Sequence, residues 1–203
     1  MMVPSCSDTE IIMEEAKVKK QNLRNETREK LAALSESEIK EKTDLLTNQL
    51  LDFANFLESE TALFYLKPDY IVDTRRIIKI CLSLPKQIAL PSFGPDKRIT
   101  LWKINNLDED LLPDGFTPNQ DRCKMVPFDD IDIAIIPGIA FDEKGGRLGT
   151  GRGDYDRMIP KLPNTVRKVA LALTEQVLPG LPMESHDKFV DIIITDSRII
   201  YKI

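Results

Sequence analysis

The sequence has 203 residues, of which 42% are hydrophobic and 30% charged, so it can form one well-buried core but is too short for two domains of ordinary size. Its formal net charge of -5 argues against nonspecific nucleic-acid binding, and no apolar run approaches the roughly 20 residues of a membrane span. The N-terminus lacks a signal-peptide layout and the 3 cysteines form no Cys-x-x-Cys pair, so a cytoplasmic protein with reduced thiols is expected.

Residues 1–9 are expected to form a disordered leader, and residues 10–203 a single domain. Residues 10–33 have a helical and heavily charged pattern, in which Lys20 and Arg24 are four positions apart and so share one face. A charged helical face is usually just solvated. Two cations at this spacing repel each other unless an anion lies between them. A phosphate site and a solvated face are therefore equally consistent with this pair.

The next segments alternate between helix and strand. Ser35 is a suitable N-cap for a second helix, and Glu38 stands at the capping-box position. We expect helices at residues 35–57 and 73–84, strands at residues 62–66, 88–90 and 99–104, and long loops at residues 105–130. Pro91 is expected to end the strand at residues 88–90, because proline has no N–H to donate to a sheet.

A nearly continuous apolar run at residues 131–136 predicts a parallel strand that is buried on both faces. Pro137 and Gly138 are expected to stop this strand, and a short apolar segment at residues 139–141 follows. Further buried strands are predicted at residues 169–173 and 190–195. Strands that alternate with helices indicate an α/β sheet with right-handed connections.

The segment at residues 147–156 has the composition of an anion site. Its glycines alternate with Thr150 and Arg152, so backbone N–H groups can converge on an anion without Cβ atoms in the way. Arg147 and Arg152 add charge-assisted donors for phosphate oxygens. Asp154 and Asp156 follow, and carboxylates beside a phosphate cradle are suited to Mg²⁺. The alternative is a surface hairpin in which the glycines make turns and the charges are solvated.

Four segments together resemble the 5-formyltetrahydrofolate cyclo-ligase family, also called methenyltetrahydrofolate synthetases. They are KQNLR at residues 20–24, PGIAFD at residues 137–142, RLGTGRGDYD at residues 147–156, and the stretch from Glu175-Gln176 through Leu181-Pro182 to His186-Asp187. The resemblance covers residues 17–195 or thereabouts. It implies a three-layer α/β/α single domain with a mainly parallel central sheet.

The resemblance implies an ATP- and Mg²⁺-dependent ligase that converts 5-formyltetrahydrofolate to 5,10-methenyltetrahydrofolate and releases ADP and phosphate. In that family ATP activates the N5-formyl oxygen, N10 attacks the activated carbon, and phosphate leaves. A formamide oxygen is a poor leaving group that phosphorylation improves, and N10 is tethered in the same molecule. The protein then mainly has to position and neutralise the phosphates.

The resemblance also implies a role for individual residues. Lys20 and Arg24 would meet the nucleotide phosphates, and Asp156 and Asp187 would hold Mg²⁺. The rest of the ATP site would be Arg147, Leu148, Gly149, Thr150, Gly151, Arg152, Gly153, Asp154 and Tyr155. The folate would be bordered by Leu66, Asp69, Ile71, Thr150, Gly151, Arg152, Gly153 and Asp154. The catalytic residues would be Arg147, Arg152 and Tyr155.

Three positions depart from the family pattern. The glutamate that usually binds the pterin is Ile71 in this chain, one of two paired tyrosines is Asp154, and an arginine often found after Leu-Pro is Ser92. A pterin ring needs polar partners for its donors and acceptors. We expect Asp69 to supply the missing acceptor, because it lies in the same loop as Ile71.

Two alternative functions, besides that of a cyclo-ligase, are consistent with the same residues. One is a diverged relative that keeps the ATP site but acts on another substrate, and the other is a non-enzymatic nucleotide-binding protein on this fold. The expected partners are ATP and a reduced folate, with no nucleic acid and no membrane. The expected state is a monomer or a weak homodimer.

Overall fold

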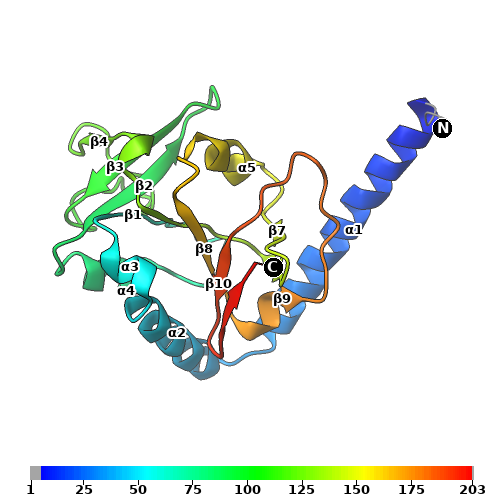
Figure 1. Cartoon of the computed structure of the whole chain (residues 1–203), viewed down its shortest axis with the longest axis horizontal. Helices are drawn as coiled ribbons and strands as arrows, with labels where there is room; N and C mark the ends of the chain where they lie inside the picture. Colours follow the sequence, from blue (N-terminus) through cyan, green and yellow to red (C-terminus); the bar gives the residue numbers. More distant parts are fainter. Residues whose placement is uncertain (1–5, 203) are drawn as a thin grey trace.

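The computed structural model describes residues 6–202, and their side chains from Glu15 onward (Figure 1). The first helix, α1 (Cys6–Ala32), begins before the expected start at residue 10, so residues 6–9 of the expected leader are helical. Residues 1–5 of that leader lie outside the described residues. None of the described helices is long and apolar enough to cross a membrane.

The centre of the structure is an eight-stranded sheet with the order β11-β10-β8-β5-β1-β2-β3-β4. Its strands are β1 (Thr61–Leu63), β2 (Gln87–Phe93), β3 (Ile99–Ile104), β4 (Met125–Val126), β5 (Ile133–Ile135), β8 (Arg167–Leu171), β10 (Ile192–Ile194) and β11 (Ile199–Tyr201). The strands from β2 to β10 in this order pair in parallel, whereas β11, β3 and β4 pair antiparallel at the two sides. The predicted mainly parallel α/β architecture is therefore confirmed.

The predicted strand at residues 131–136 lies in the middle of this sheet as β5. Its three residues are fully buried, and Ala134 pairs with Leu63 of β1 in parallel register. The strand ends before Pro137, as expected from the missing N–H. Because the parallel strands run the same way, the loops after β1, β2, β5 and β8 leave from one edge of the sheet, where ligands usually bind in α/β folds.

A second, three-stranded sheet has the order β7-β6-β9, with β6 (Ala140–Asp142), β7 (Arg147–Leu148) and β9 (Val177–Leu178). Ala140, Leu148 and Leu178 of this sheet form a small hydrophobic cluster, and Leu23 of α1 packs against it. This contact holds α1 against β7 and the glycine-rich segment after it (Figure 1). The expected apolar segment at residues 139–141 is thus divided, since Ala140 belongs to the core of this small sheet while Ile139 and Phe141 pack into the main core.

The remaining helices are α2 (Glu36–Leu51), α3 (Ala54–Glu58), α4 (Arg75–Cys81) and α5 (Asp154–Met158), with short 3₁₀ turns η1 (Phe128–Asp130), η2 (Ile159–Lys161) and η3 (Thr174–Gln176). The helices α2, α3 and α4 lie together at one side of the large sheet, away from α1 and α5 (Figure 1). The predicted capping box is confirmed, since the Glu38 N–H donates to Ser35 Oγ at 3.2 Å and the Ser35 N–H donates to Glu38 Oε2 at 2.8 Å.

Three expectations about element boundaries are wrong. The single helix expected at residues 35–57 is broken at Phe53, which adopts an extended conformation and turns its ring into the core. Pro91 lies inside β2 rather than after it, because the ladder with β1 has already ended at Ala89 and needs no N–H from Pro91. An unexpected last strand, β11, forms an antiparallel hairpin with β10.

Candidate active site

A cleft of about 1060 Å³, called the large cleft below, is lined by residues of α1 between Lys17 and Arg24, of segment 147–156, and of segment 184–187. These three parts are far apart in sequence. The packing of α1 on the small sheet brings the first two together. Most of the residues expected to bind a nucleotide therefore line one hollow.

Lys20 is buried in the wall of the large cleft, where its Nζ lies 2.6 Å from Glu184 Oε2 and 2.6 Å from Asp187 Oδ2. Burial lowers the pKa of Lys20, but its hydrogen bonds to Asp187 and Glu184 outweigh this and raise the pKa above the ordinary value. Lys20 is therefore charged at neutral pH. In this structure it neutralises two carboxylates at the cleft wall.

Arg24 lies one helical turn further along α1 and reaches the glycine-rich segment. Its Nε donates to the carbonyl oxygen of Gly149 at 2.7 Å, and its Nη1 donates to Gln21 Oε1 at 3.3 Å. Both acceptors are neutral. The spacing of Lys20 and Arg24 thus does place both cations on the cleft, but Arg24 keeps a positive charge there that these contacts do not cancel.

The glycine-rich segment has the backbone conformation that only glycine adopts readily. Gly151 has φ of +97° and Gly153 has φ of +68°, both in the left-handed region. A side chain at Gly149 would clash instead, since an added Cβ would lie 2.8 Å from Arg147 Nη1. The segment can therefore wrap closely around a ligand in the cleft.

Arg147 is the most deeply buried cation of the large cleft. Its Nη2 donates to Asp156 Oδ1 at 2.6 Å and its Nη1 donates to the Pro137 carbonyl oxygen at 3.2 Å. Its Nε has no hydrogen-bond partner among the described residues. A buried N–H without a partner costs free energy, and an anion in the cleft would satisfy it once the Arg147 side chain turns toward the cleft.

The carboxylates expected to hold a metal ion are both paired with cations in this structure. Asp156 Oδ1 accepts from Arg147 and, at 3.1 Å, from the Lys188 N–H. Asp187 Oδ2 accepts from Lys20 and, at 2.8 Å, from the Glu184 N–H. Because both carboxylates line the cleft, a competing cation could reach either of them.

Within the described residues, Glu184, His186 and Asp187 form a group whose possible ligand atoms all lie within 4.8 Å of one another. Carboxylate oxygens are the hard ligands that Mg²⁺ prefers, so Glu184 and Asp187 fit that ion. Asp156 is not a member of this group. Reasoning from the sequence selected Asp187 but missed Glu184, although the acidic residue only three positions away was the available signal.

A second hollow of about 200 Å³, called the small cavity below, adjoins the carboxyl ends of β1 and β2. It is lined by Leu66, Lys67, Pro91, Ser92, Phe93, Phe116, Thr117 and Tyr155. The rings of Phe93 and Tyr155 lie 5.4 Å apart, and the Tyr155 hydroxyl has no hydrogen-bond partner among the described residues. Burial raises the pKa of Tyr155 well above its ordinary value, so the hydroxyl keeps its proton. An aromatic wall suits a flat heterocycle.

The structure does not bring together all the residues that were expected to bind the folate. Leu66 and Tyr155 line the small cavity. Asp69 is 43% exposed and accepts a hydrogen bond from Arg152 Nη2 at 2.6 Å, while Ile71 packs against the main core. In the described part of the chain, neither Asp69 nor Ile71 is among the residues that line the small cavity.

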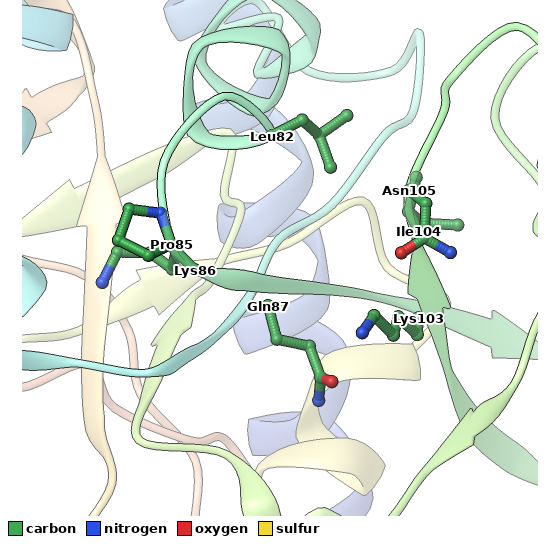
Figure 2. A pocket seen from close by; sticks show the side chains of 7 residues that line it. All are labelled: Leu82, Pro85, Lys86, Gln87, Lys103, Ile104 and Asn105. Atoms are coloured by element: carbon green, nitrogen blue, oxygen red, sulfur yellow. The ribbon is translucent and has the colours of Figure 1, made fainter.

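A third hollow, of about 370 Å³, lies at the start of β2 and the end of β3, the opposite edge of the sheet from the small cavity (Figure 2). Its lining is mostly polar and includes Lys86 and Lys103. The Lys86 ammonium is already used by the chain, since it donates to the Phe56 carbonyl oxygen at 2.7 Å and to Ser59 Oγ at 2.9 Å. This hollow therefore offers no convergent set of free donors comparable with the large cleft.

Comparison with known proteins gives one consistent result. The sequence model of the "5-formyltetrahydrofolate cyclo-ligase family" matches residues 16–196. The chain is 26% identical to the "Probable 5-formyltetrahydrofolate cyclo-ligase" of Schizosaccharomyces pombe, over 92% of this chain and 99% of that protein. It is 28% identical to the mouse "5-formyltetrahydrofolate cyclo-ligase", over 85% of this chain and 91% of that protein.

Two solved structures share the fold. The Aquifex aeolicus 5,10-methenyltetrahydrofolate synthetase superposes with a TM-score of 0.77 at 26% identity, covering 90% of this chain and 92% of that chain. The Mycoplasma pneumoniae 5,10-methenyltetrahydrofolate synthetase has a TM-score of 0.69 at 21% identity, covering 87% of this chain and 98% of that chain. The eight-stranded mixed sheet with flanking helices is thus the architecture of these structures.

Proposed function

Because the chain belongs to the 5-formyltetrahydrofolate cyclo-ligase family, we propose that its large cleft binds ATP and its small cavity binds the ring of the folate. The activity is that of the family, the ATP-dependent conversion of 5-formyltetrahydrofolate to 5,10-methenyltetrahydrofolate. What is proposed is the assignment of the two substrates to the two hollows and the role of each residue there.

The observation that carries the assignment of ATP is the buried Arg147 in the large cleft, whose Nε lacks a partner among the described residues. A phosphate oxygen is a strong acceptor and would satisfy this donor once Arg147 turns from Asp156 toward the cleft. Arg24 adds positive charge from α1, and the backbone N–H groups around Gly151 can approach an anion closely. Lys20, Leu148, Thr150, Arg152 and Gly153 complete the proposed ATP site.

Mg²⁺ would be held by Asp187 and Asp156, with Glu184 as a further oxygen ligand beside Asp187. When bound, the ion supplies charge neutralisation for the phosphates. In the free protein Lys20 neutralises Glu184 and Asp187, and Arg147 neutralises Asp156. We propose that both cations turn to the phosphates when the carboxylates take the metal, so the site exchanges its ion pairs without leaving a charge unpaired.

The folate ring is proposed to lie against the aromatic side chains and Leu66 in the small cavity, where Ser92 and Thr117 offer hydroxyls to its polar edge. A hollow of about 200 Å³ takes a ring system rather than a whole folate. The segment from Thr150 to Asp154 runs between the two hollows and would border both substrates.

The reaction then takes place where the two hollows meet. The formyl oxygen attacks the γ-phosphorus of ATP, and ADP leaves with the electron pair of the broken P–O bond. N10 attacks the formyl carbon, the C–O bond breaks, and phosphate leaves with its electron pair. The proton of N10 goes to water, and the product is the methenyl bridge. Attack within one molecule gains effective concentration, so the protein needs to supply only orientation and charge.

The single domain at residues 10–203, the cytoplasmic location and the monomeric or weakly dimeric state stay predictions. Asp69 as the acceptor for the pterin also stays a prediction, and its pairing with Arg152 on the surface does not favour it.

The test is the near-ultraviolet absorbance of methenyltetrahydrofolate, formed from 5-formyltetrahydrofolate with ATP and Mg²⁺. Arg147→Lys keeps the charge but removes the planar set of donors, and we expect kcat/KM for ATP to fall about 100-fold. Arg122→Lys, at an exposed arginine that pairs with Glu109, is the matched control and should act like the wild type. Full activity of a folded Arg147→Lys protein would contradict the assignment of ATP to the large cleft.

A further inference from the structure

Lys67 stands at the boundary between the two hollows. It follows the end of β1 and lines the small cavity, where its Nζ lies 4.6 Å from the centre of the Phe93 ring. Its Nζ is also 3.4 Å from Oδ2 of Asp154. Asp154 lies in the chain between Gly153, which lines the large cleft, and Tyr155, which lines the small cavity. Lys67 therefore presents a positive charge at the place where the two hollows approach each other.

The pairing around Lys67 leaves its ammonium donors largely unused. Asp154 is shared, because its Oδ1 accepts from Arg157 at 2.8 Å and its Oδ2 also lies 3.5 Å from Arg152 Nε. Asp69 pairs with Arg152 on the outer side. Three cations, Lys67, Arg152 and Arg157, thus share two carboxylates, Asp69 and Asp154. Of the four N–O distances between them, only that from Arg152 Nε to Asp154, at 3.5 Å, is longer than the 3.4 Å of Lys67. A negative group at the boundary would meet an excess of positive charge.

Among the described residues that line the small cavity, Lys67 is the single charged side chain. The other polar groups of the lining are the hydroxyls of Ser92, Thr117 and Tyr155. Burial lowers the pKa of Lys67 below its ordinary value, Asp154 and Asp69 offset part of this, and Arg152 adds to it. Lys67 is thus a desolvated cation, which interacts more strongly with a developing charge than an exposed one.

We propose that Lys67 is a catalytic residue whose ammonium lies beside the N5-formyl oxygen of the folate, donates to the phosphoryl group that this oxygen takes up, and stabilises the oxygen as it leaves with phosphate. This oxygen has to lie at the boundary, because the γ-phosphoryl group comes from the large cleft while the formyl group is attached to the ring in the small cavity. The assignment therefore rests on the placement of the two substrates proposed above.

Lys67 keeps its proton throughout this step. It neutralises the oxygens of the transferred phosphoryl group and then the negative charge that develops on the former formyl oxygen as the C–O bond breaks and phosphate leaves. Asp154 is a positioning residue, since its carboxylate holds the ammonium at the boundary. The aspartate that departs from the paired tyrosines of the family thus has a specific task in this chain, to hold a lysine.

The experiment compares Lys67→Met and Lys67→Arg in steady-state assays with 5-formyltetrahydrofolate and ATP. Removing one donor to a developing oxyanion typically costs about 100- to 1,000-fold in kcat, and for a flexible lysine we expect a loss of about 10- to 100-fold in Lys67→Met. KM for ATP should stay within about twofold, and Lys67→Arg should recover part of kcat because it restores the charge. Asp154→Asn should lower kcat less than Lys67→Met does.

The matched control is Lys202→Met, which removes a lysine that lies 4.5 Å from the centre of the Phe189 ring, away from both hollows. It should leave kcat and both KM values unchanged. An unchanged kcat in Lys67→Met, or a change confined to KM for the folate, would overturn the assignment of Lys67 to the reacting oxygen. So would an equal loss in Lys67→Met and Lys67→Arg, since that would show a steric rather than a charge effect.

A further pair of variants separates this assignment from the placement on which it rests. Leu66→Trp fills the small cavity and should raise KM for the folate at least about tenfold while leaving KM for ATP unchanged. If Leu66→Trp lowers the melting temperature, the half-buried Thr117→Phe fills the same cavity from the loop side. An unchanged KM in the folded variant would refute the placement of the folate. A raised KM together with a fully active Lys67→Met would refute the role of Lys67 alone.

Discussion

Two lysines in this structure bind two carboxylates each, in nearly the same geometry but in different places. Lys20 of α1 lies 2.6 Å from both Glu184 and Asp187, and Lys42 of α2 lies 2.9 Å from Glu175 and 3.0 Å from Asp196. We call these the Lys20 cluster and the Lys42 cluster. The distances and charges alone do not distinguish a structural cluster from one that takes part in ligand binding.

Their surroundings differ. In the Lys42 cluster, Asp196 Oδ1 also accepts from the N–H of Thr174 at 2.6 Å and from its Oγ1 at 3.0 Å, so both oxygens of Asp196 are used by other parts of the chain. Glu175 Oε2 is buried with no partner among the described residues, and the cluster lines neither of the two hollows. In the Lys20 cluster, the large cleft opens beside the carboxylates, and Arg24 and Arg147 line it too. An ion pair that lines neither the large cleft nor the small cavity stabilises the fold, whereas one that borders a cleft with spare donors can exchange its partners for a ligand.

The largest expected effect is at the carboxylate that would meet the metal. Asp187→Asn should lower kcat/KM for ATP about 100-fold and shift the Mg²⁺ dependence to higher concentration, because a hard cation loses a charged ligand. Asp196→Asn, its counterpart in the Lys42 cluster, should leave the Mg²⁺ titration unchanged. Measuring activity against Mg²⁺ concentration checks both. Identical titrations of the two variants would remove the distinction between the clusters.

The next effect is at the lysines themselves. Lys20→Met should raise KM for ATP about tenfold, since about 1.4 kcal/mol of phosphate interaction corresponds to that factor. Lys42→Met should keep the KM of the wild type. Steady-state kinetics with varied ATP separates them. A raised KM in Lys42→Met would mean that the Lys42 cluster takes part in binding as well.

Mg²⁺ without nucleotide gives a smaller but sharper test. In the wild type the ion has to displace Lys20 from Glu184 and Asp187, whereas in Lys20→Met those carboxylates have lost their cation. A ligand that binds the native state stabilises it, so Mg²⁺ should raise the melting temperature of Lys20→Met by a few degrees more than that of the wild type. Lys42→Met should show no such gain. Equal shifts in all three proteins would contradict the exchange of ion pairs.

The smallest effect concerns acid stability. Burial raises the pKa of Asp196, but its hydrogen bonds from Lys42 and Thr174 outweigh this and hold the pKa below the ordinary value. A carboxyl whose pKa is lower in the folded state stabilises the fold above its unfolded pKa, and this stability is lost as the pH falls through the folded value. The free energy of unfolding should therefore fall less steeply between pH 4 and pH 2 in Asp196→Asn than in the wild type. Denaturant titrations at these two pH values decide it, and parallel slopes would contradict it.

The sequence by itself determined the features that depend on neighbouring residues. The capping box of Ser35 and Glu38, the buried strand before Pro137 and the single face shared by Lys20 and Arg24 all follow from spacing of a few residues. The prediction that the glycine-rich segment lets the backbone approach an anion was likewise made from the sequence, whereas the left-handed conformations of Gly151 and Gly153 came from the structure. The fold class follows from the same kind of pattern, repeated along the chain.

The tertiary structure alone decided which side chains meet. Lys20 pairs with residues 164 and 167 positions away, and Asp69 pairs with Arg152, 83 positions away. The break of the helix at Phe53 and the passage of β2 through Pro91 also depend on distant partners, a core and the end of a neighbouring strand. The physical reason is that periodicity and capping act over one or two helical turns, while ion-pair partners are set by the order of the strands and by the docking of α1 on the small sheet.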